Sequence, residues 1–270
     1  MEITVNRPIV ETFGWLKVGG KKIEVPDEIN KTIYSIAEGD EENIIFYDNG
    51  ETNDIEINLS KNAKLNLIHI KEEKNIGGES ALSHSDIRVK CADNSNFHWY
   101  RIVLDGRKTY DNCSVSLEGK GSSFNADIGY RLSGEDLLDV NCEAIHTGCD
   151  TASEILSSGV LKDRADKLLR GTIDFRQGAK GAVGNEIDDV LMMDRSVRNR
   201  TVPVILCAEE DVAGNHGATI GRPDENILYY MKSRGIDEKS ALKMLSDAKL
   251  AAVIEKIPEE KIKEELKEKI

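Results

Sequence analysis

The sequence predicts a mainly β protein, folded as a solenoid of stacked coils and followed by a small helical region. Three observations support this prediction. Apolar and polar residues alternate in short runs from about residue 44 to residue 212, short polar turns separate the runs, and a helical pattern begins only after Pro223. Alternation with a period of two marks strands with one buried face, and regularly spaced turns are typical of sandwiches, barrels and solenoids.

The alternating runs define the expected strands. Residues 55–59 (IEINL), 87–91 (IRVKC) and 113–117 (CSVSL) each place apolar side chains on one face. No amphipathic helix interrupts this rhythm before Pro223, and stacked coils bury a continuous inner face while the outer face stays polar. The pattern therefore favours a solenoid, although a β-sandwich remains an alternative on pattern alone.

Two helices are expected after the strands. Asp224 can cap a helix of residues 225–234, which Gly235 can end, and Asp237 can cap a second helix. In the second helix the apolar side chains recur at the spacing of one helical face. This predicts that the following residues are buried together: Ala241, Met244, Leu245, Ala248, Ala251 and Ala252.

The end of the chain completes the helical region. Pro258 should end the second helix, and a short charged helix is expected in residues 259–270. These helices carry too little apolar surface for an independent domain, so we expect them to form a cap packed on the end of the solenoid, a docking surface for a partner, or both. We predict three regions: an N-terminal segment (1–43), a solenoid core (44–222) and a C-terminal helical region (223–270).

Composition argues against several classes of protein. The 270-residue chain has 39% hydrophobic residues and a formal net charge of −13, which argues against wholesale disorder and against binding to nucleic-acid phosphates. No apolar run is long enough to span a membrane, and the start has no apolar core of a signal peptide, so we expect a cytoplasmic protein without membrane contact. The five cysteines are scattered and odd in number, as expected of free thiols in a reducing compartment.

His216 is the first candidate ligand for a metal or cluster. It lies between Gly214 and Gly217, and we expect a glycine-flanked turn there because glycine tolerates positive φ and close backbone approach. Neutral imidazole is a common metal ligand, and three carboxylates stand nearby in the sequence, at residues 209–211. The alternative is a histidine that only hydrogen-bonds the local backbone.

A second group of candidates lies in residues 141–150 (NCEAIHTGCD) and in the apolar run around Cys207. His146 shares the parity of Cys142 on an expected strand, and Cys149 follows after a glycine, a spacing that resembles a metal site. We therefore consider Cys207, Cys149 and His146 as metal ligands. The alternative is that they are core residues or chance cysteines, and Cys91 is expected to be core.

The sequence lacks the motifs of standard catalytic and nucleotide sites. It contains no GxxxxGK[ST], GxSxG, HExxH or CxxC. We therefore expect a chain that does not bind nucleotide directly and is not an enzyme by itself.

Over residues 145–245 the sequence resembles the SufB/SufD family of iron–sulfur cluster assembly scaffolds. The resemblance rests on a series of short motifs, of which the pair HGAT and YYxxSRG is the most specific. They are HTG (146–148), SSG (157–159), GTIDF (171–175), DVLM (189–192), HGATIG (216–221) and LYYMKSRG (228–235).

The resemblance implies a fold, partners and a bound group. The fold is a right-handed parallel β-helix core with a small C-terminal α-helical domain. Two such subunits pair through the β-helix, as a homodimer or with a second SufB/SufD-like subunit, and the C-terminal helices dock a SufC-like ABC ATPase. The cofactor is a transient iron–sulfur cluster on the complex, and His216 matches the histidine implicated in cluster formation at the dimer interface.

The chain departs from the family pattern beside this histidine. Gly217 stands where SufB-type members have a glutamate, and Gly214 stands where some SufD-type members have a cysteine. Cys207 or Cys149 is then the remaining source of a thiol. Two alternative functions follow from these departures and from the fold: a structural partner subunit that binds no cluster, and a β-helix enzyme that acts on polysaccharide.

Overall fold

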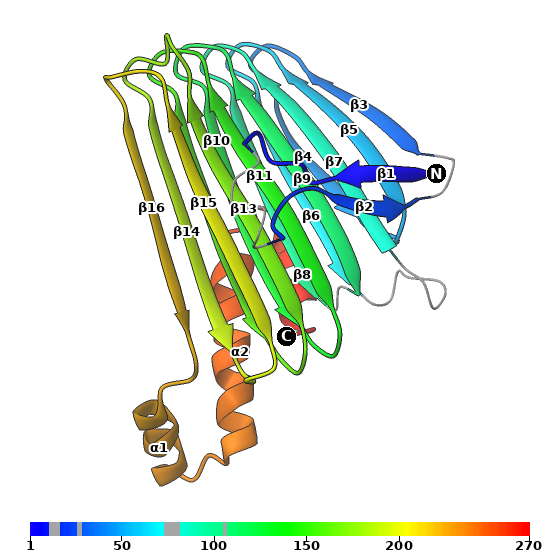
Figure 1. Ribbon diagram of the computed structural model, residues 1–270, viewed down its shortest axis with the longest axis vertical. Coiled ribbons are helices and arrows are strands. Elements are labelled where there is room, and N and C mark those ends of the chain that lie inside the picture. Colours follow the sequence, from blue (N-terminus) through cyan, green and yellow to red (C-terminus); the bar gives the residue numbers. More distant parts are fainter. Residues whose placement is uncertain (11–16, 26–28, 73–81, 105–106) are drawn as a thin grey trace.

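Two parallel sheets form the body of the molecule. The computed structural model describes residues 1–10, 17–25, 29–72, 82–104 and 107–270. Within them, strands β3 to β16 alternate along the chain between two seven-stranded sheets (Figure 1). The odd sheet contains β3 (Asn30–Ile36), β5 (Thr52–Leu59), β7 (Leu82–Cys91), β9 (Lys108–Leu117), β11 (Leu137–His146), β13 (Asp166–Phe175) and β15 (Arg198–Cys207). The even sheet contains β4 (Glu41–Tyr47), β6 (Lys64–Glu72), β8 (Asn96–Leu104), β10 (Ser123–Leu132), β12 (Ala152–Leu161), β14 (Val183–Met192) and β16 (Ala213–Gly221).

These sheets make a solenoid. Each strand hydrogen-bonds to the strand two places along the chain, so two successive strands form one coil. The register is continuous: Cys113 in β9 pairs with Cys142 in β11, which pairs with Gly171 in β13. The prediction of a mainly β parallel solenoid is confirmed, and a sandwich of antiparallel sheets is excluded. The right hand of the predicted β-helix, which is the usual hand of parallel crossovers, stays a prediction.

The inward side chains of the two sheets form the main core, in a space that we call the lumen. Most of it is apolar: Trp99 is fully buried, and the rings of Phe97 and Phe124 stack with their centroids 5.7 Å apart. Cys91 and Cys113 lie in this core, as their alternating positions predicted. Charged side chains occupy inward positions at two places, one in the early coils and one in the late coils.

Helices cover part of the outer face of the even sheet (Figure 1). Helices α2 (Glu238–Ile254) and α3 (Glu260–Lys267) pack apolar side chains such as Val253 against outward residues such as Ile68. Gly129 permits this close approach, because a Cβ at that position would lie 3.1 Å from Val253 Cγ1. The helices are therefore anchored to the outer face of the even sheet, which corrects the expected cap on the end of the solenoid. None of the helices in the described residues is long and apolar enough to cross a membrane.

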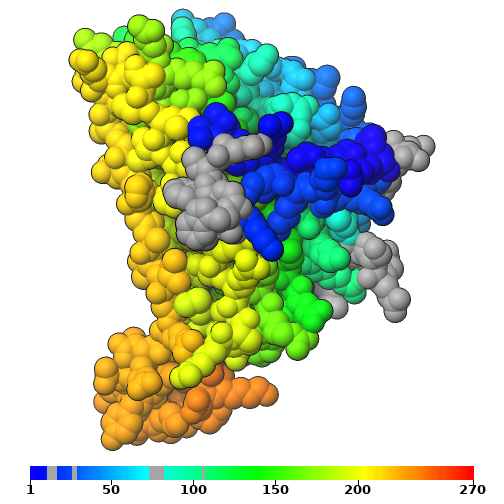
Figure 2. All heavy atoms as spheres, viewed as in Figure 1, coloured from blue at the N-terminus to red at the C-terminus, as the bar shows by residue number. Residues whose placement is uncertain are grey.

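The N-terminal segment lies on the opposite face. An antiparallel hairpin of β1 (Glu2–Val5) and β2 (Lys21–Glu24), dark blue in Figure 2, covers part of the odd sheet. Ile23 packs against Tyr110 in this contact. The solenoid itself begins before the predicted boundary at residue 44, because β3 already opens the odd sheet at Asn30.

The helix starts agree with the sequence. The Asp224 side chain accepts a hydrogen bond from the Asn226 backbone at the start of α1 (Glu225–Ser233), and Asp237 accepts one from the Ser240 backbone at the start of α2. Gly235 ends the first helix region with a φ of 85°, which favours glycine.

The predicted buried face of α2 is wrong except for Ala241, which is buried as expected. Met244 is 52% exposed, and Ala248 and Ala252 are also exposed. The residues buried on α2 are Ala241, Ser246, Leu250, Val253 and Ile254. The large branched side chains near the end of the helix bury more apolar area than the alanines do, so they decide which face meets the sheet.

Candidate functional site

The last coil of the solenoid is open. Among the described strands, β16 pairs only with β14, and β15 pairs only with β13, so both are edge strands. Nearly every residue of β16 is exposed. His216 is the fourth residue of this strand, which corrects the predicted glycine-flanked turn: parallel pairing with β14 draws the glycines into an extended strand.

The position of His216 in the ladder fixes the face on which it lies. His216 pairs with Glu186 of β14, and paired residues in a parallel ladder point to the same face of the sheet. The Glu186 carboxyl group reaches across the lumen to Gly171 of the odd sheet, where a Cβ would collide with it. His216 therefore lies on the lumen side of the even sheet, at its exposed end.

Beneath His216 the lumen is polar, which the sequence analysis missed. Glu186 is 1% exposed, and neither of its carboxylate oxygens has a partner in the described structure. Burial raises the pKa of Glu186 to about 8, and the charge of Asp188 acts in the same direction. Asp188 is paired with Lys167 and accepts a hydrogen bond from Thr201 Oγ1 at 2.6 Å. A signal was available, because Glu186 and Asp188 share the parity of the buried Val190.

The two exposed thiols lie at the turns, away from the middle of β16. Cys207 ends β15, and its Sγ donates to the Glu209 carbonyl at 3.1 Å. Cys149 follows β11, and its Sγ donates to the Gly178 carbonyl at 3.3 Å. The Glu209 carboxylate in turn accepts a hydrogen bond from the Gly178 backbone. Both thiols therefore border the same row of turns, two coils apart from each other.

His146 lies inside the lumen and uses both ring nitrogens. Nδ1 is 2.8 Å from Thr151 Oγ1, and Nε2 is 2.9 Å from Ser153 Oγ. Burial lowers its pKa to about 4, so the ring is neutral. Phe175 stands between His146 and Cys207 in the ladder, which separates their strands by about 10 Å. The structure does not bring His146 together with His216.

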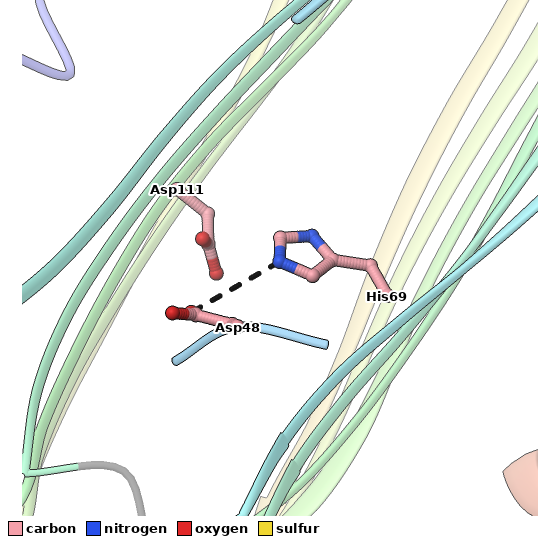
Figure 3. Close-up of side chains that lie close together, drawn as sticks. All are labelled: Asp48, His69 and Asp111. Carbon is pink, nitrogen blue, oxygen red and sulfur yellow. Dashed lines mark ion pairs between the residues drawn. The ribbon is translucent and has the colours of Figure 1, made fainter. Parts of the chain in front are cut away.

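One group of potential metal ligands is compact. Asp48, His69 and Asp111 place one ligand atom each within 4.8 Å of one another, and all three are buried (Figure 3). In the described part of the chain this is the sole such group of three, so His216, Cys207, Cys149 and His146 form none within one chain. The sequence analysis drew no hypothesis on these three residues, because they are far apart in the chain.

The compact group already holds a positive charge. Arg101 Nε donates to Asp111 Oδ2 at 2.8 Å, and Arg101 Nη2 donates to Asp48 Oδ2 at 3.1 Å. Charge from Arg101 and Lys71 lowers the pKa of Asp48 to about 2 against the opposing, largest effect of burial. The guanidinium thus takes the role that a cation would have between the two carboxylates.

Comparison with known proteins identifies the family. A family described as "SUF system FeS cluster assembly, SufBD core domain" matches residues 31–249, from β3 into α2. The chain belongs to the SufBD family. This confirms the resemblance drawn from the HGAT and YYxxSRG motifs.

Two SufBD relatives illustrate the extent of the match. The chain is 30% identical over 172 residues to the iron–sulfur cluster assembly protein SufD of Bacillus subtilis, which covers 64% of this chain and 39% of that protein. It is 31% identical over 161 residues to an iron–sulfur cluster assembly SufBD family protein of Staphylococcus saprophyticus, which covers 58% and 34%. The match therefore spans less than half of each relative.

Proposed function

We propose that this chain is a scaffold subunit for iron–sulfur cluster assembly, which works with a SufC-like ABC ATPase and is not an enzyme by itself. The observation that carries the proposal is the placement of His216. This histidine of the family's HGAT motif lies on the lumen side of an open terminal coil, where a second subunit has access to it.

The open coil supports a paired arrangement. Edge strands present unpaired backbone groups that other proteins cover or pair, and both β15 and β16 are edges. Ile187 and Ile220, on the last two strands of the even sheet, are each 46% exposed, which favours a partner surface. We propose that a second copy, or a second SufB/SufD-like subunit, pairs with this end and brings two sites together.

The cluster is the cargo of this interface. Iron accepts imidazole and thiolate ligands, so His216 would hold one iron while a thiol completes the set. Cys207 and Cys149 are the exposed cysteines, but both lie at the turns. A thiol would therefore come from the partner subunit, or from a rearrangement of the turn after β15.

Helix α1 supports docking of the ATPase. It has no buried residue and exposes Tyr229 (77%), Tyr230 (58%) and Ile227 (46%). Figure 1 shows it projecting beyond the end of the sheets. Exposed aromatic side chains are enriched at protein interfaces. We propose that this helix contacts the ATPase, which supplies the nucleotide site that the sequence lacks; a cytoplasmic location stays a prediction.

Anaerobic iron and sulfide reconstitution tests the proposal. The chain is loaded alone and with its ATPase, and bound iron is followed by visible absorption and Mössbauer spectroscopy. We expect His216→Ala to lose most of the iron that the wild-type complex takes up. Asn215→Ala, the preceding exposed residue of β16, serves as the control and should bind iron normally. Equal iron in wild type and His216→Ala would refute the ligand assignment.

A structural subunit that binds no cluster is the second candidate. One observation favours it: within the described residues, His216 belongs to no compact group of three potential metal ligands. The same reconstitution separates the two functions, because a structural subunit would bind the ATPase and take up no iron. The polysaccharide enzyme has no such support. The cleft of about 440 Å³ beside the β1–β2 hairpin holds charged residues that pair with one another, as Arg88 does with Asp54 and Asp86.

A further inference from the structure

A cavity of about 670 Å³ lies between the first part of α2 and the even sheet. On the sheet side it is lined by the ends of β10 and β12 and by Met193 and Asp194, which follow β14. On the helix side it is lined by one face of α2, from Glu238 to Asp247. Figure 1 shows α2 extending beyond the ends of the strands. A cavity of this size is typical of binding sites for small organic molecules.

The packing of α2 explains why the cavity exists. The last turns of the helix bury Leu250, Val253 and Ile254, whose large branched side chains hold this end against the even sheet. Before Leu250 the helix buries only Ala241 and Ser246, and their side chains are too short to fill the space beside the sheet. Atoms that line unfilled space lose packing contacts, so an occupant that restores these contacts is stabilised.

The walls of the cavity are largely apolar. Val160 and Leu132, from the sheet, are 2% and 0% exposed. Met193 and Leu242 add partly buried side chains from the two sides. Apolar groups that enter such a space are removed from water, which is favourable. The walls therefore select an occupant with an apolar body, not an inorganic ion.

A buried hydroxyl group also faces the cavity. Ser246 lines it and is 8% exposed. Within the described residues its Oγ makes no hydrogen bond, although a serine inside a helix can donate to the backbone carbonyl four residues earlier. A hydroxyl that is buried without a partner is unfavourable. An occupant with a hydrogen-bonding group near Ser246 would remove this cost.

Two lysines give the cavity a positive charge at its other end. Lys162 follows β12 and Lys239 is the second residue of α2, and both are exposed. Neither side chain has an ion pair in the part of the chain that the structure describes, whereas Glu238 beside them is paired with Lys232 at 2.9 Å. Glu238 and Asp194 line the same cavity, so their charges favour a singly charged anion over a doubly charged phosphate.

We propose that this cavity binds a small amphipathic organic anion. Its carboxylate is bound by Lys162 and Lys239, its apolar body packs against Val160 and Leu242, and a hydrogen-bonding group at its far end meets Ser246. Lys239 and Ser246 are seven residues apart on one helix, which separates the two polar ends of the ligand by about 10 Å. The site lies on the side of α2 that faces the sheet, and it does not depend on the proposed assembly function.

Calorimetry of the full chain with three related ligands tests the proposal. The ligands are 10-hydroxydecanoate, which has both polar ends, decanoate, which lacks the hydroxyl, and 1,10-decanediol, which lacks the charge. We expect 10-hydroxydecanoate to bind about 2- to 10-fold more tightly than decanoate, because its hydroxyl pairs with Ser246. The diol should bind more weakly than 10-hydroxydecanoate. Ser246→Ala should make the two carboxylates bind equally.

Matched lysine variants test the charged end. Lys162→Gln combined with Lys239→Gln should weaken both carboxylates about 10-fold and leave the diol unchanged. Lys61→Gln combined with Lys90→Gln makes the same change of net charge at exposed lysines that do not line the cavity, and it should bind all three ligands as the wild type does.

A filled cavity tests the location. Leu242→Trp places a large side chain in the cavity and should abolish binding, whereas Met244→Trp, at a side chain of α2 that is 52% exposed, should retain it. Circular dichroism checks that each variant is folded, and the comparison of the three ligands on the wild type decides without any variant. The proposal is overturned if 10-hydroxydecanoate shows no saturable binding to the wild type, or if its affinity is the same in Leu242→Trp.

Discussion

The two polar regions of the lumen differ in the kind of group that they leave unpaired. In the early coils, Arg101 pairs with both Asp48 and Asp111, and the group without a hydrogen bond is the Lys71 ammonium. In the late coils, Lys167 neutralises Asp188, and the unpaired group is the Glu186 carboxyl group. The region in the early coils therefore lacks a hydrogen-bond acceptor for Lys71. The region in the late coils lacks a hydrogen-bond donor or a cation for Glu186.

This difference arises on one scaffold. Both regions use inward positions of the same parallel ladders, and both contain charged groups that are at least nine-tenths buried. What differs is access. The side chains of the early coils are fully buried, namely Asp48, His69, Lys71, Arg101 and Asp111, whereas Glu186 lies one strand below the exposed His216. A solenoid can thus hold a fully enclosed polar cluster in one coil and a polar cluster next to its open end in another, without a change of fold.

The largest expected change in stability follows from the removal of Arg101. Arg101→Met would leave Asp48 and Asp111 buried without a counter-charge, which should lower the free energy of unfolding by about 3–5 kcal/mol. Urea unfolding measures this. Arg88→Met is the control, because the Arg88 side chain is 46% exposed and its ion pairs should contribute less than about 1 kcal/mol.

Replacement of the two carboxylates by neutral amides offers a rescue of that variant. Adding Asp48→Asn and Asp111→Asn to Arg101→Met should restore much of the stability, because the charges that need Arg101 are gone. If Arg101→Met were as stable as Arg88→Met, the two carboxylates would not depend on the guanidinium, and the contrast between the two regions would disappear.

The second-largest expected effect is the pH dependence of stability that Glu186 causes. Its pKa is about 8 in the folded protein and about 4.5 in the unfolded chain, so between these values the folded state binds more protons. The free energy of unfolding should therefore decrease as pH rises from 4.5 to 8, by up to about 4 kcal/mol. Glu186→Gln should flatten this part of the profile and stabilise the protein at pH 8.

The control for the pH profile lies on the neighbouring strand. Glu154 of β12 is exposed, so Glu154→Gln should leave the profile of the wild type unchanged. Urea unfolding at several pH values gives the three curves. Parallel curves for wild type and Glu186→Gln would show that Glu186 is ionised and partnered, in contrast to the unpaired carboxyl group described above.

The smallest expected effect is the difference in stability between alanine substitutions at two glycines in the late coils. A Cβ at Gly171 would collide with the Glu186 carboxyl group, so Gly171→Ala should cost about 1–3 kcal/mol. At Gly217 nothing lies within 4 Å, so Gly217→Ala should change the stability by less than about 0.5 kcal/mol. Thermal unfolding compares the two variants. Equal costs would mean that Glu186 can move away from Gly171.

The fold was predictable from local patterns. Alternation such as that of residues 113–117 marks strands whatever their partners, and Asp224 and Asp237 cap helices through contacts two or three residues away. The buried face of α2 was predicted correctly only at Ala241. Which face of α2 is buried depends on contact with Ile68 and its neighbours, which are about 180 residues distant in the sequence.

The site was only partly predictable, for the same physical reason. The family motifs selected His216, but its placement in a strand depends on pairing with β14, 30 residues earlier. Charged residues such as Lys71 and Glu186 look like outward-facing positions in an alternating strand, because burial of a charge is unfavourable without a partner. Their partners and neighbours come from other strands, as Arg101 shows by bridging Asp48 and Asp111.

The ladder of the middle coils has a consequence for the length of the molecule. Cys113, Cys142 and Gly171 pair in sequence at intervals of 29 residues, from Cys113 to Cys142 and again from Cys142 to Gly171. Such a repeat is modular. A chain without residues 137–165 would lack β11 and β12, and β9 could then pair with β13 in the same register. It would lose His146 and Cys149 yet keep both polar regions of the lumen. The number of coils can therefore change in evolution independently of the chemistry at either end.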